Sequence, residues 1–222
     1  MLPVIKMYSQ IRMNNIPFIS DKHIVVPEMN SSLTVKGINM PEGFVVTAEA
    51  FRIFIKENNL QLPLSKILEE LDTQKFSNIV KTGKAARQLI LENELPHKLE
   101  IEIRNAHYQL CGEETNVSVT IRSSATSQDL PACGCTQQLE SFVNIKGEDA
   151  LINAVHNCFA SLFSERAIYE RHHKGIANAD IAISLAVEKM KKTNCSSSNQ
   201  AFDIDPLKGF DKIMSFKTVE KA

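Results

Sequence analysis

The sequence predicts an α+β fold, in which a short extended start and a helical layer precede a region of mixed strands and helices. Three observations predict it. Apolar residues recur at helical spacing between residues 47 and 110, two later segments alternate as strands do, and residues 181–190 form an apolar run of strand length. The 222 residues are 43% apolar and 23% charged, which is ordinary for a globular chain with a buried core.

The first half predicts helices after an extended, proline-punctuated segment over residues 1–45. Helices are expected over residues 47–59, 63–72, 76–94 and 95–110. Thr47 is a residue type that caps helix N-termini, and Pro63 is tolerated in a first turn. The last of these helices has an apolar stripe at helical spacing, formed by Leu99, Ile103, Ala106 and Leu110.

The second half mixes the two periodicities. Strands are expected over residues 117–122, 140–145 and 181–190, helices over 147–163 and 164–175, and a hairpin over 195–216 around the turn DPLKG. Ser164 is a candidate N-cap. The first of these helices buries Leu151, Val155, Cys158 and Leu162 on one face, with His156 packed at its edge. The run ERHHK is expected to be solvated.

Charge and cysteine content exclude several function classes. The net charge is −1, so nothing favours nucleic acid or an anionic membrane as a partner. No apolar run has the length of a membrane span, and the N-terminus lacks the apolar core of a signal peptide. Five cysteines at irregular spacing do not form a disulfide framework. A cytoplasmic location is therefore expected.

The cysteines in RSSATSQDLPACGCTQQLESF, residues 122–142, raise the question of a metal site. Cys133 and Cys135 are separated by a single residue. A structural zinc ion needs four ligands, usually in two pairs, and no second cysteine pair follows. His172 and His173 are adjacent, so a helix would point them in different directions. The sequence therefore predicts no metal site.

A phosphate site is the better interpretation of the same stretch. Arg122 ends a predicted strand, where a rigid backbone can aim its guanidinium group at phosphate oxygens. Hydroxyl groups lie nearby in the sequence, on Ser123, Ser124, Thr126 and Ser141. A loop between two strands can also present backbone N–H groups to a phosphate chain. No Walker-type loop, dinucleotide fingerprint or nucleophile elbow is present in the sequence.

Long motifs in matching order resemble the phosphoenolpyruvate synthase (pyruvate, water dikinase) family. RSSATSQDLP, at residues 122–131, is similar to the family's RSSATAEDLP. Further segments that resemble the family are residues 7–16, 37–51, 140–171, 181–190 and 196–213. The resemblance covers essentially the whole chain apart from residues 15–35.

The resemblance implies an N-terminal nucleotide-binding domain with an ATP-grasp-like fold that binds ATP with Mg²⁺. In this family a phosphoryl group passes from ATP to a histidine of a separate domain and then to pyruvate, giving phosphoenolpyruvate, AMP and phosphate. Arg122 matches an arginine that grips the ATP phosphates, and Ser141 matches a threonine of a phosphate loop. Gln137 stands at a glycine of that loop, and Glu188 at a glutamine beside the adenine. No residue of this chain matches the phosphorylated histidine.

Several residues depart from the family at the positions that contact phosphate. Met29 stands where the family has a phosphate-binding lysine, and a thioether cannot pair with phosphate. Pro27 and Glu28 replace two glycines, and Asn199 replaces a glycine of the late hairpin. Weak or absent ATP binding is therefore expected from the isolated chain.

We expect residues 1–222 to be an incomplete nucleotide-binding domain, with parts at about 1–112, 113–190 and 191–222. The phosphohistidine and pyruvate-binding domains would then lie on another chain. The alternative is a non-catalytic binding module that keeps the fold and has lost the chemistry. It is favoured by the selective change of phosphate-contacting residues while the apolar segments stay periodic.

Overall fold

The computed structural model describes residues 3–12, 19, 23–24, 41–112, 114, 117–127, 138–176 and 181–190. The chain divides into two compact units, Met1–Lys191 and Lys192–Ala222, and every described residue belongs to the first. Three features of the sequence lie outside the described residues: Met29 with its neighbours, the loop that holds Cys133, Cys135 and Gln137, and the hairpin predicted over 195–216. The subdivision into three parts stays a prediction.

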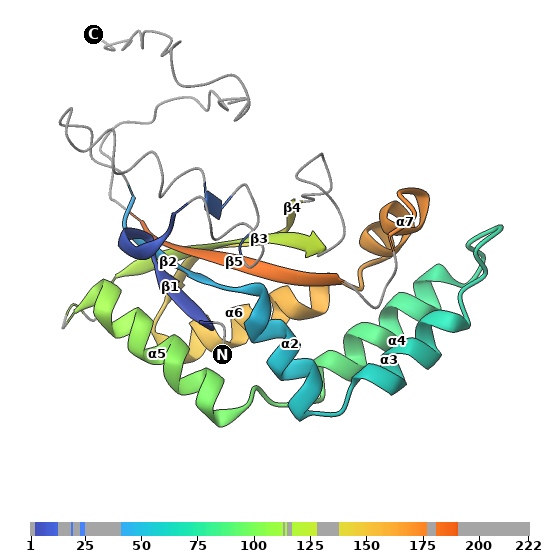
Figure 1. The fold of residues 1–222 in the computed structure, drawn as a ribbon, viewed down its shortest axis with the longest axis horizontal. Helices are drawn as coiled ribbons and strands as arrows, with labels where there is room; N and C mark the ends of the chain where they lie inside the picture. Colours follow the sequence, from blue (N-terminus) through green and yellow to red (C-terminus); the bar gives the residue numbers. More distant parts are fainter. Residues whose placement is uncertain are drawn as a thin grey trace, which may run out of the picture. The chain divides into compact units, whose positions relative to one another are not determined.

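A five-stranded sheet forms the centre of this unit (Figure 1). Its strands are β1 (Ile5–Met7), β2 (Gly43–Val46), β3 (Ser118–Ser127), β4 (Gln138–Lys146) and β5 (Ile181–Lys189). They lie in the order β1-β2-β5-β3-β4, and each neighbouring pair is antiparallel. The predicted α+β class is confirmed. The first eight of the nine residues of β5 are buried because this strand lies in the middle of the sheet.

The helices begin and end close to the predicted positions. They are the short 3₁₀ helix η1 (Tyr8–Gln10) and α2 (Ala48–Glu57), α3 (Gln61–Glu69), α4 (Ile79–Leu91), α5 (His97–Cys111), α6 (Glu148–Ser161) and α7 (Glu165–His173). Helices α2, α5 and α6 pack against one face of the sheet, while α3 and α7 contact α4 (Figure 1). No helix of the described residues is both long and apolar enough to cross a bilayer.

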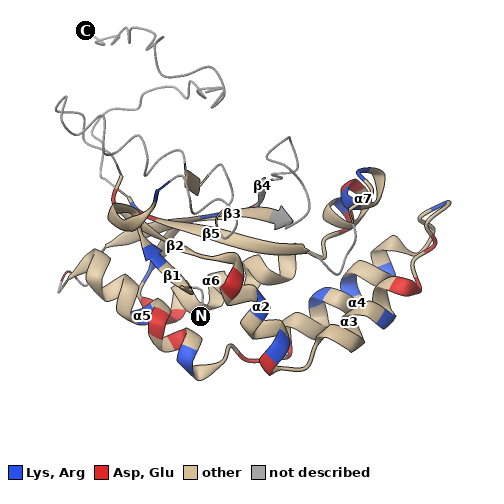
Figure 2. Ribbon diagram, viewed as in Figure 1, with Lys and Arg blue, Asp and Glu red and all other residues tan. Residues whose placement is uncertain are grey.

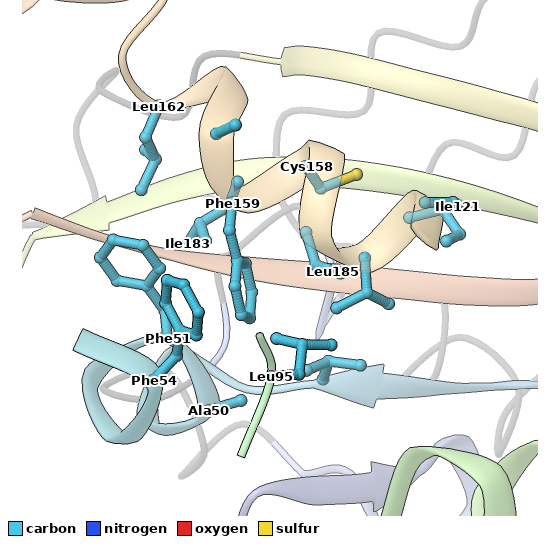
Figure 3. Close-up of a cluster of buried hydrophobic side chains, with 14 of the residues drawn as sticks. Ala50, Phe51, Phe54, Leu95, Ile121, Cys158, Phe159, Leu162, Ile183 and Leu185 are labelled. Atoms are coloured by element: carbon cyan, nitrogen blue, oxygen red, sulfur yellow. The ribbon is translucent and has the colours of Figure 1, made fainter. Parts of the chain in front are cut away.

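The main core lies between the sheet and α2, α5 and α6 (Figure 3). The rings of Phe51 and Phe54 on α2 contact Phe159 on α6, with centroids 5.3 and 5.6 Å away. Both predicted apolar stripes, on α5 and on α6, are buried in this core. His156 also behaves as predicted, since its Nε2 donates to the Ile90 carbonyl over 2.8 Å beside the Phe54 ring.

The two predicted N-caps differ in outcome. The Ser164 hydroxyl accepts a hydrogen bond from the Ala167 N–H, as expected of a cap. Thr47 occupies the N-cap position of α2, but its side chain makes no capping hydrogen bond. Its hydroxyl instead donates to the Pro3 carbonyl over 2.8 Å, and its N–H donates to the Val4 carbonyl. Thr47 therefore holds the N-terminal segment against the start of α2.

The prediction that the ERHHK run is solvated is wrong for Arg171, which is buried. Its guanidinium group donates to the Leu162 carbonyl and lies 5.8 Å from the centroid of the Phe163 ring. Burial lowers the pKa of Arg171 to about 10. His172 and His173 are exposed as expected, although both rings contact Phe76.

Candidate functional site

A row of side chains crosses the sheet on the face turned away from α2, α5 and α6, here called the distal face. Val45 of β2 pairs with Ala186 of β5, Ala186 pairs with Arg122 of β3, and Arg122 pairs with Ser141 of β4. Directly paired residues of antiparallel strands point to the same face. The register therefore places Arg122 and Ser141 side by side on one face, as the phosphate interpretation requires.

The adjacent row confirms which face this is. Phe44, Val187, Ile121 and Phe142 pair in the same order across the same strands. These apolar side chains belong to the core beneath the sheet or pack against it. Since successive residues of a strand point to opposite faces, Arg122 must project away from that core.

Strand β4 carries two irregularities that flank this pair. The register shifts between Val119 and Ile121 and again between Arg122 and Ser124, and each shift adds one residue to β4. Asn144, within the first of these bulges, has a φ of 58°. Bulges re-aim side chains and often lie beside functional sites. Here they bracket the stretch of β4 that contains Ser141.

Charged residues are few on the strands (Figure 2), and two of them form an ion pair on the distal face. Nη2 of Arg122 lies 3.5 Å from Oε2 of Glu188. The arginine side chain is 56% exposed, whereas the Glu188 side chain is 10% exposed. Oε1 of Glu188 accepts a 2.8 Å hydrogen bond from the Tyr8 hydroxyl. Glu188 therefore has a partner on each carboxylate oxygen.

Gly43 makes room for this arrangement. It pairs directly with Glu188 across β2 and β5. A Cβ atom at position 43 would lie 2.4 Å from the Val187 carbonyl oxygen and 3.1 Å from the Tyr8 ring. Any other residue would force the backbone and the ring apart. The absence of a side chain thus lets the Tyr8 ring lie against β2 with its hydroxyl on Glu188.

Tyr8 is held as a neutral hydrogen-bond donor. Burial raises its pKa well above the usual value, and the charge of Glu188 and the hydrogen bond to it raise the pKa further. The positive charge of Arg122 opposes this shift. The phenol proton therefore stays on Tyr8 at any physiological pH and points at the carboxylate.

One step of the tyrosine titration should consequently be displaced to high pH, as followed by ultraviolet absorbance of the phenolate. Tyr8→Phe should remove this step, and Glu188→Gln should move it to lower pH. The folded chain holds the proton more tightly than the unfolded chain, so stability should fall as the pH rises above about 10. A step that is unchanged in Glu188→Gln would contradict the hydrogen-bonded pair.

The serines near Arg122 divide into structural and candidate binding residues. Ser123 is buried, and its hydroxyl donates to the Glu140 carbonyl over 2.6 Å, which attaches β3 to β4. Ser124 is buried and pairs with Ser184 of β5. The Ser184 hydroxyl lies 3.0 Å from Nδ1 of the buried His23. Only Ser141, among these serines, is exposed beside Arg122.

The structure thus brings together three of the four residues predicted from the sequence: Arg122, Ser141 and Glu188. Gln137 lies outside the described residues. Sequence reasoning missed Tyr8, whose contact with Glu188 spans 180 positions of the chain. Within the described ranges, no three His, Cys, Asp or Glu side chains are grouped so as to hold a metal ion.

The α+β architecture is consistent with the family whose model matches this chain. The family described as "Pyruvate phosphate dikinase, AMP/ATP-binding domain" matches residues 22–219, and the chain belongs to this family. The predicted resemblance is therefore confirmed.

Individual relatives point the same way. The chain is 34% identical over 212 residues to the phosphoenolpyruvate synthase of Escherichia coli (strain K12), which covers 96% of this chain and 27% of that protein. It is 36% identical over 209 residues to the phosphoenolpyruvate synthase of Synechocystis sp. (strain PCC 6803), covering 91% and 26%. A probable phosphoenolpyruvate synthase of Methanocaldococcus jannaschii is 36% identical over 182 residues, covering 80% and 15%. The chain spans about a quarter of the length of the first two of these relatives.

Proposed function

We propose that this chain is an ATP-binding module, ATP-grasp-like in fold, of a phosphoenolpyruvate synthase. Arg122 and Ser141 contact the phosphates, Gln137 lies in the phosphate loop, and Glu188 lies close to the nucleoside. The observation that carries the proposal is the direct pairing of Arg122 with Ser141 on the distal face, with an arginine side chain 56% exposed. A guanidinium group on a central strand is a rigid, permanently charged partner for phosphate oxygens.

Mg²⁺ is proposed to reach the site on the phosphates of ATP. This ion keeps several water ligands and is typically bound through one or two carboxylates together with substrate phosphates. The described residues offer no ready-made cluster of ligands, and Glu188 is occupied by Tyr8 and Arg122. The described part of the chain therefore fits a metal that arrives with the nucleotide, and its own role is to bind and orient the phosphates.

The complete reaction is proposed to need phosphohistidine and pyruvate-binding domains in addition to this module. We place the module in the cytoplasm. Cys111 and Cys158 are buried free thiols, which suits a reducing compartment. Burial raises the pKa of both thiols, so neither is a reactive thiolate.

Calorimetric titration with Mg-ATP, together with a thermal-unfolding scan in the same buffer, tests the proposal. Weak but saturable binding of Mg-ATP by a cooperatively folded chain is expected. A folded chain that releases no heat at any ATP concentration would favour the second candidate, a non-catalytic binding module. The intact core and the loss of the phosphate-binding lysine at Met29 favour that alternative.

Met29→Lys is expected to strengthen ATP binding about 10- to 100-fold. A lysine there would add one charge-assisted phosphate contact, which contributes roughly 1.5–3 kcal/mol. The same titration measures the change, with Met40→Lys as a control that adds the same charge elsewhere in the chain. An equal gain in both variants would mean that the added charge acts at long range, and no gain at Met29 would mean that Pro27 and Glu28 have changed the loop.

A further inference from the structure

We propose that Glu188 makes the site selective for a nucleoside triphosphate over a bare polyphosphate. Glu188 is the counter-ion of Arg122, so a phosphate that binds Arg122 must first break this ion pair. The inference rests on the proposed function and goes beyond it, since it assigns a specificity role to the Tyr8–Glu188–Arg122 arrangement. Tyr8 acts as a positioning residue that holds the carboxylate in place.

The two members of the ion pair differ in their freedom to move. Arg122 carries its charge on a long side chain that is 56% exposed, so the guanidinium group can turn toward a ligand. Glu188 projects from the central strand β5, is 10% exposed, and is held by the Tyr8 hydroxyl at 2.8 Å. When a phosphate engages Arg122, the arginine moves and the carboxylate stays.

When the guanidinium group of Arg122 turns from Glu188 to a phosphate, the largely buried Oε2 of Glu188 is left without its cation. A buried charged acceptor that loses its partner is costly, so this loss opposes phosphate binding. Tyr8 cannot compensate, because its single O–H already donates to Oε1. The site therefore needs a new donor at Oε2 whenever Arg122 turns to a phosphate.

A nucleoside triphosphate can supply that donor from its sugar or base, whereas the phosphate oxygens of a polyphosphate cannot. The sugar hydroxyls and the exocyclic amine of the base are neutral donors to a carboxylate. The oxygens of tripolyphosphate are acceptors that carry negative charge, so near Glu188 they add repulsion to the unpaired acceptor. The carboxylate thus penalises a ligand that offers phosphate alone and accepts one that offers phosphate together with a donor.

The experiment compares calorimetric affinities for Mg-ATP and for magnesium tripolyphosphate in the unaltered chain, in Glu188→Gln and in Glu114→Gln. A glutamine keeps the shape of residue 188 and still accepts from Tyr8, but it leaves Arg122 without a competing charge. Glu114 pairs with Lys189, the neighbour of Glu188, at 3.6 Å and is 71% exposed, so it controls for the loss of one negative charge at this end of the sheet. Circular dichroism checks that each variant is folded.

We expect the unaltered chain to prefer ATP over tripolyphosphate by about tenfold or more. Glu188→Gln should strengthen tripolyphosphate binding by about the same factor and so reduce the preference, while Glu114→Gln should leave the preference unchanged. If Glu188→Gln does not fold, Tyr8→Phe is the variant that tests the inference. It removes the hydrogen bond to Oε1, so breaking the ion pair with Arg122 costs the carboxylate more, and the preference for ATP over tripolyphosphate should increase.

An equal affinity of the unaltered chain for the two ligands would overturn the inference and leave the proposed function standing. A preference that none of the variants at Glu188 and Tyr8 changes would do the same. If ATP does not bind the unaltered chain, the proposed function fails instead. In that case, tripolyphosphate binding by Glu188→Gln alone would still support the counter-ion role, and binding by neither chain would overturn it.

Discussion

Arg122→Ala is expected to weaken ATP binding about 10- to 100-fold, which for a weakly binding chain amounts to its loss. A charge-assisted hydrogen bond contributes roughly 1.5–3 kcal/mol, and each 1.4 kcal/mol is about a factor of ten in affinity. Arg122 lies on β3 directly beside Ser141, and Nη2 of its guanidinium group lies 3.5 Å from Oε2 of Glu188. Removing it leaves the carboxylate of Glu188 on the distal face as a negative charge facing the phosphates. Calorimetric titration with Mg-ATP measures the change.

Two further variants separate the chemistry of Arg122 from its charge. Arg166→Ala removes the same charge from an exposed arginine of α7 that pairs with Glu170, and it should leave the ATP affinity unchanged. Arg122→Lys keeps the charge but loses the planar fork, and it should fall between the alanine variant and the unaltered chain. An unaltered ATP affinity in a folded Arg122→Ala protein would remove the distal face from consideration as the phosphate site.

Local periodicity was sufficient to predict the helices from α2 onward and three of the five strands, although β3 continues to Ser127, beyond its predicted end at residue 122. A helix buries residues four positions apart on one face, as it does for Leu99 and Ile103 on α5. Val155 belongs to a buried stripe of the same kind on α6. The alternation that predicts strand β3 also places Arg122 opposite the apolar row, so the exposure of the arginine follows from the same pattern. Such signals involve neighbours in the sequence and need no knowledge of the tertiary structure.

The features that sequence reasoning missed depend on contacts between distant segments. Tyr8 reaches Glu188 only because β1 and β2 pair and β2 then pairs with β5, an order that no local pattern contains. Thr47 is a cap by residue type, yet the Pro3 carbonyl, 44 positions away, takes its hydroxyl. Arg171 is charged, yet a carbonyl at the end of α6 and a phenylalanine ring cover it. Each is a case in which tertiary structure overrides a sound local expectation.

Phe159→Ala is expected to destabilise the fold by about 3–5 kcal/mol, a large share of the roughly 5–15 kcal/mol that a domain of this kind possesses. Phe159 on α6 is fully buried, and its ring contacts both Phe51 and Phe54 of α2 (Figure 3). Deleting the ring removes buried apolar surface and leaves a cavity at the contact between α2 and α6. Urea unfolding followed by circular dichroism measures the loss through the midpoint and the slope.

The loss in free energy of unfolding should depend on the burial of Phe159, and not simply on removing a large side chain from a helix. Leu62→Ala on α3 removes a large apolar side chain that is 74% exposed, and it should change the free energy of unfolding by at most about 0.5 kcal/mol. Phe159→Leu keeps part of the volume, so its loss should be smaller than that of alanine. The location of Phe159 also links stability to the site, because α6 packs against β3 and β4, the strands that carry Arg122 and Ser141. If Phe159→Ala unfolded at the same urea concentration as Leu62→Ala, the aromatic cluster would not be what holds α2 and α6 beneath the sheet.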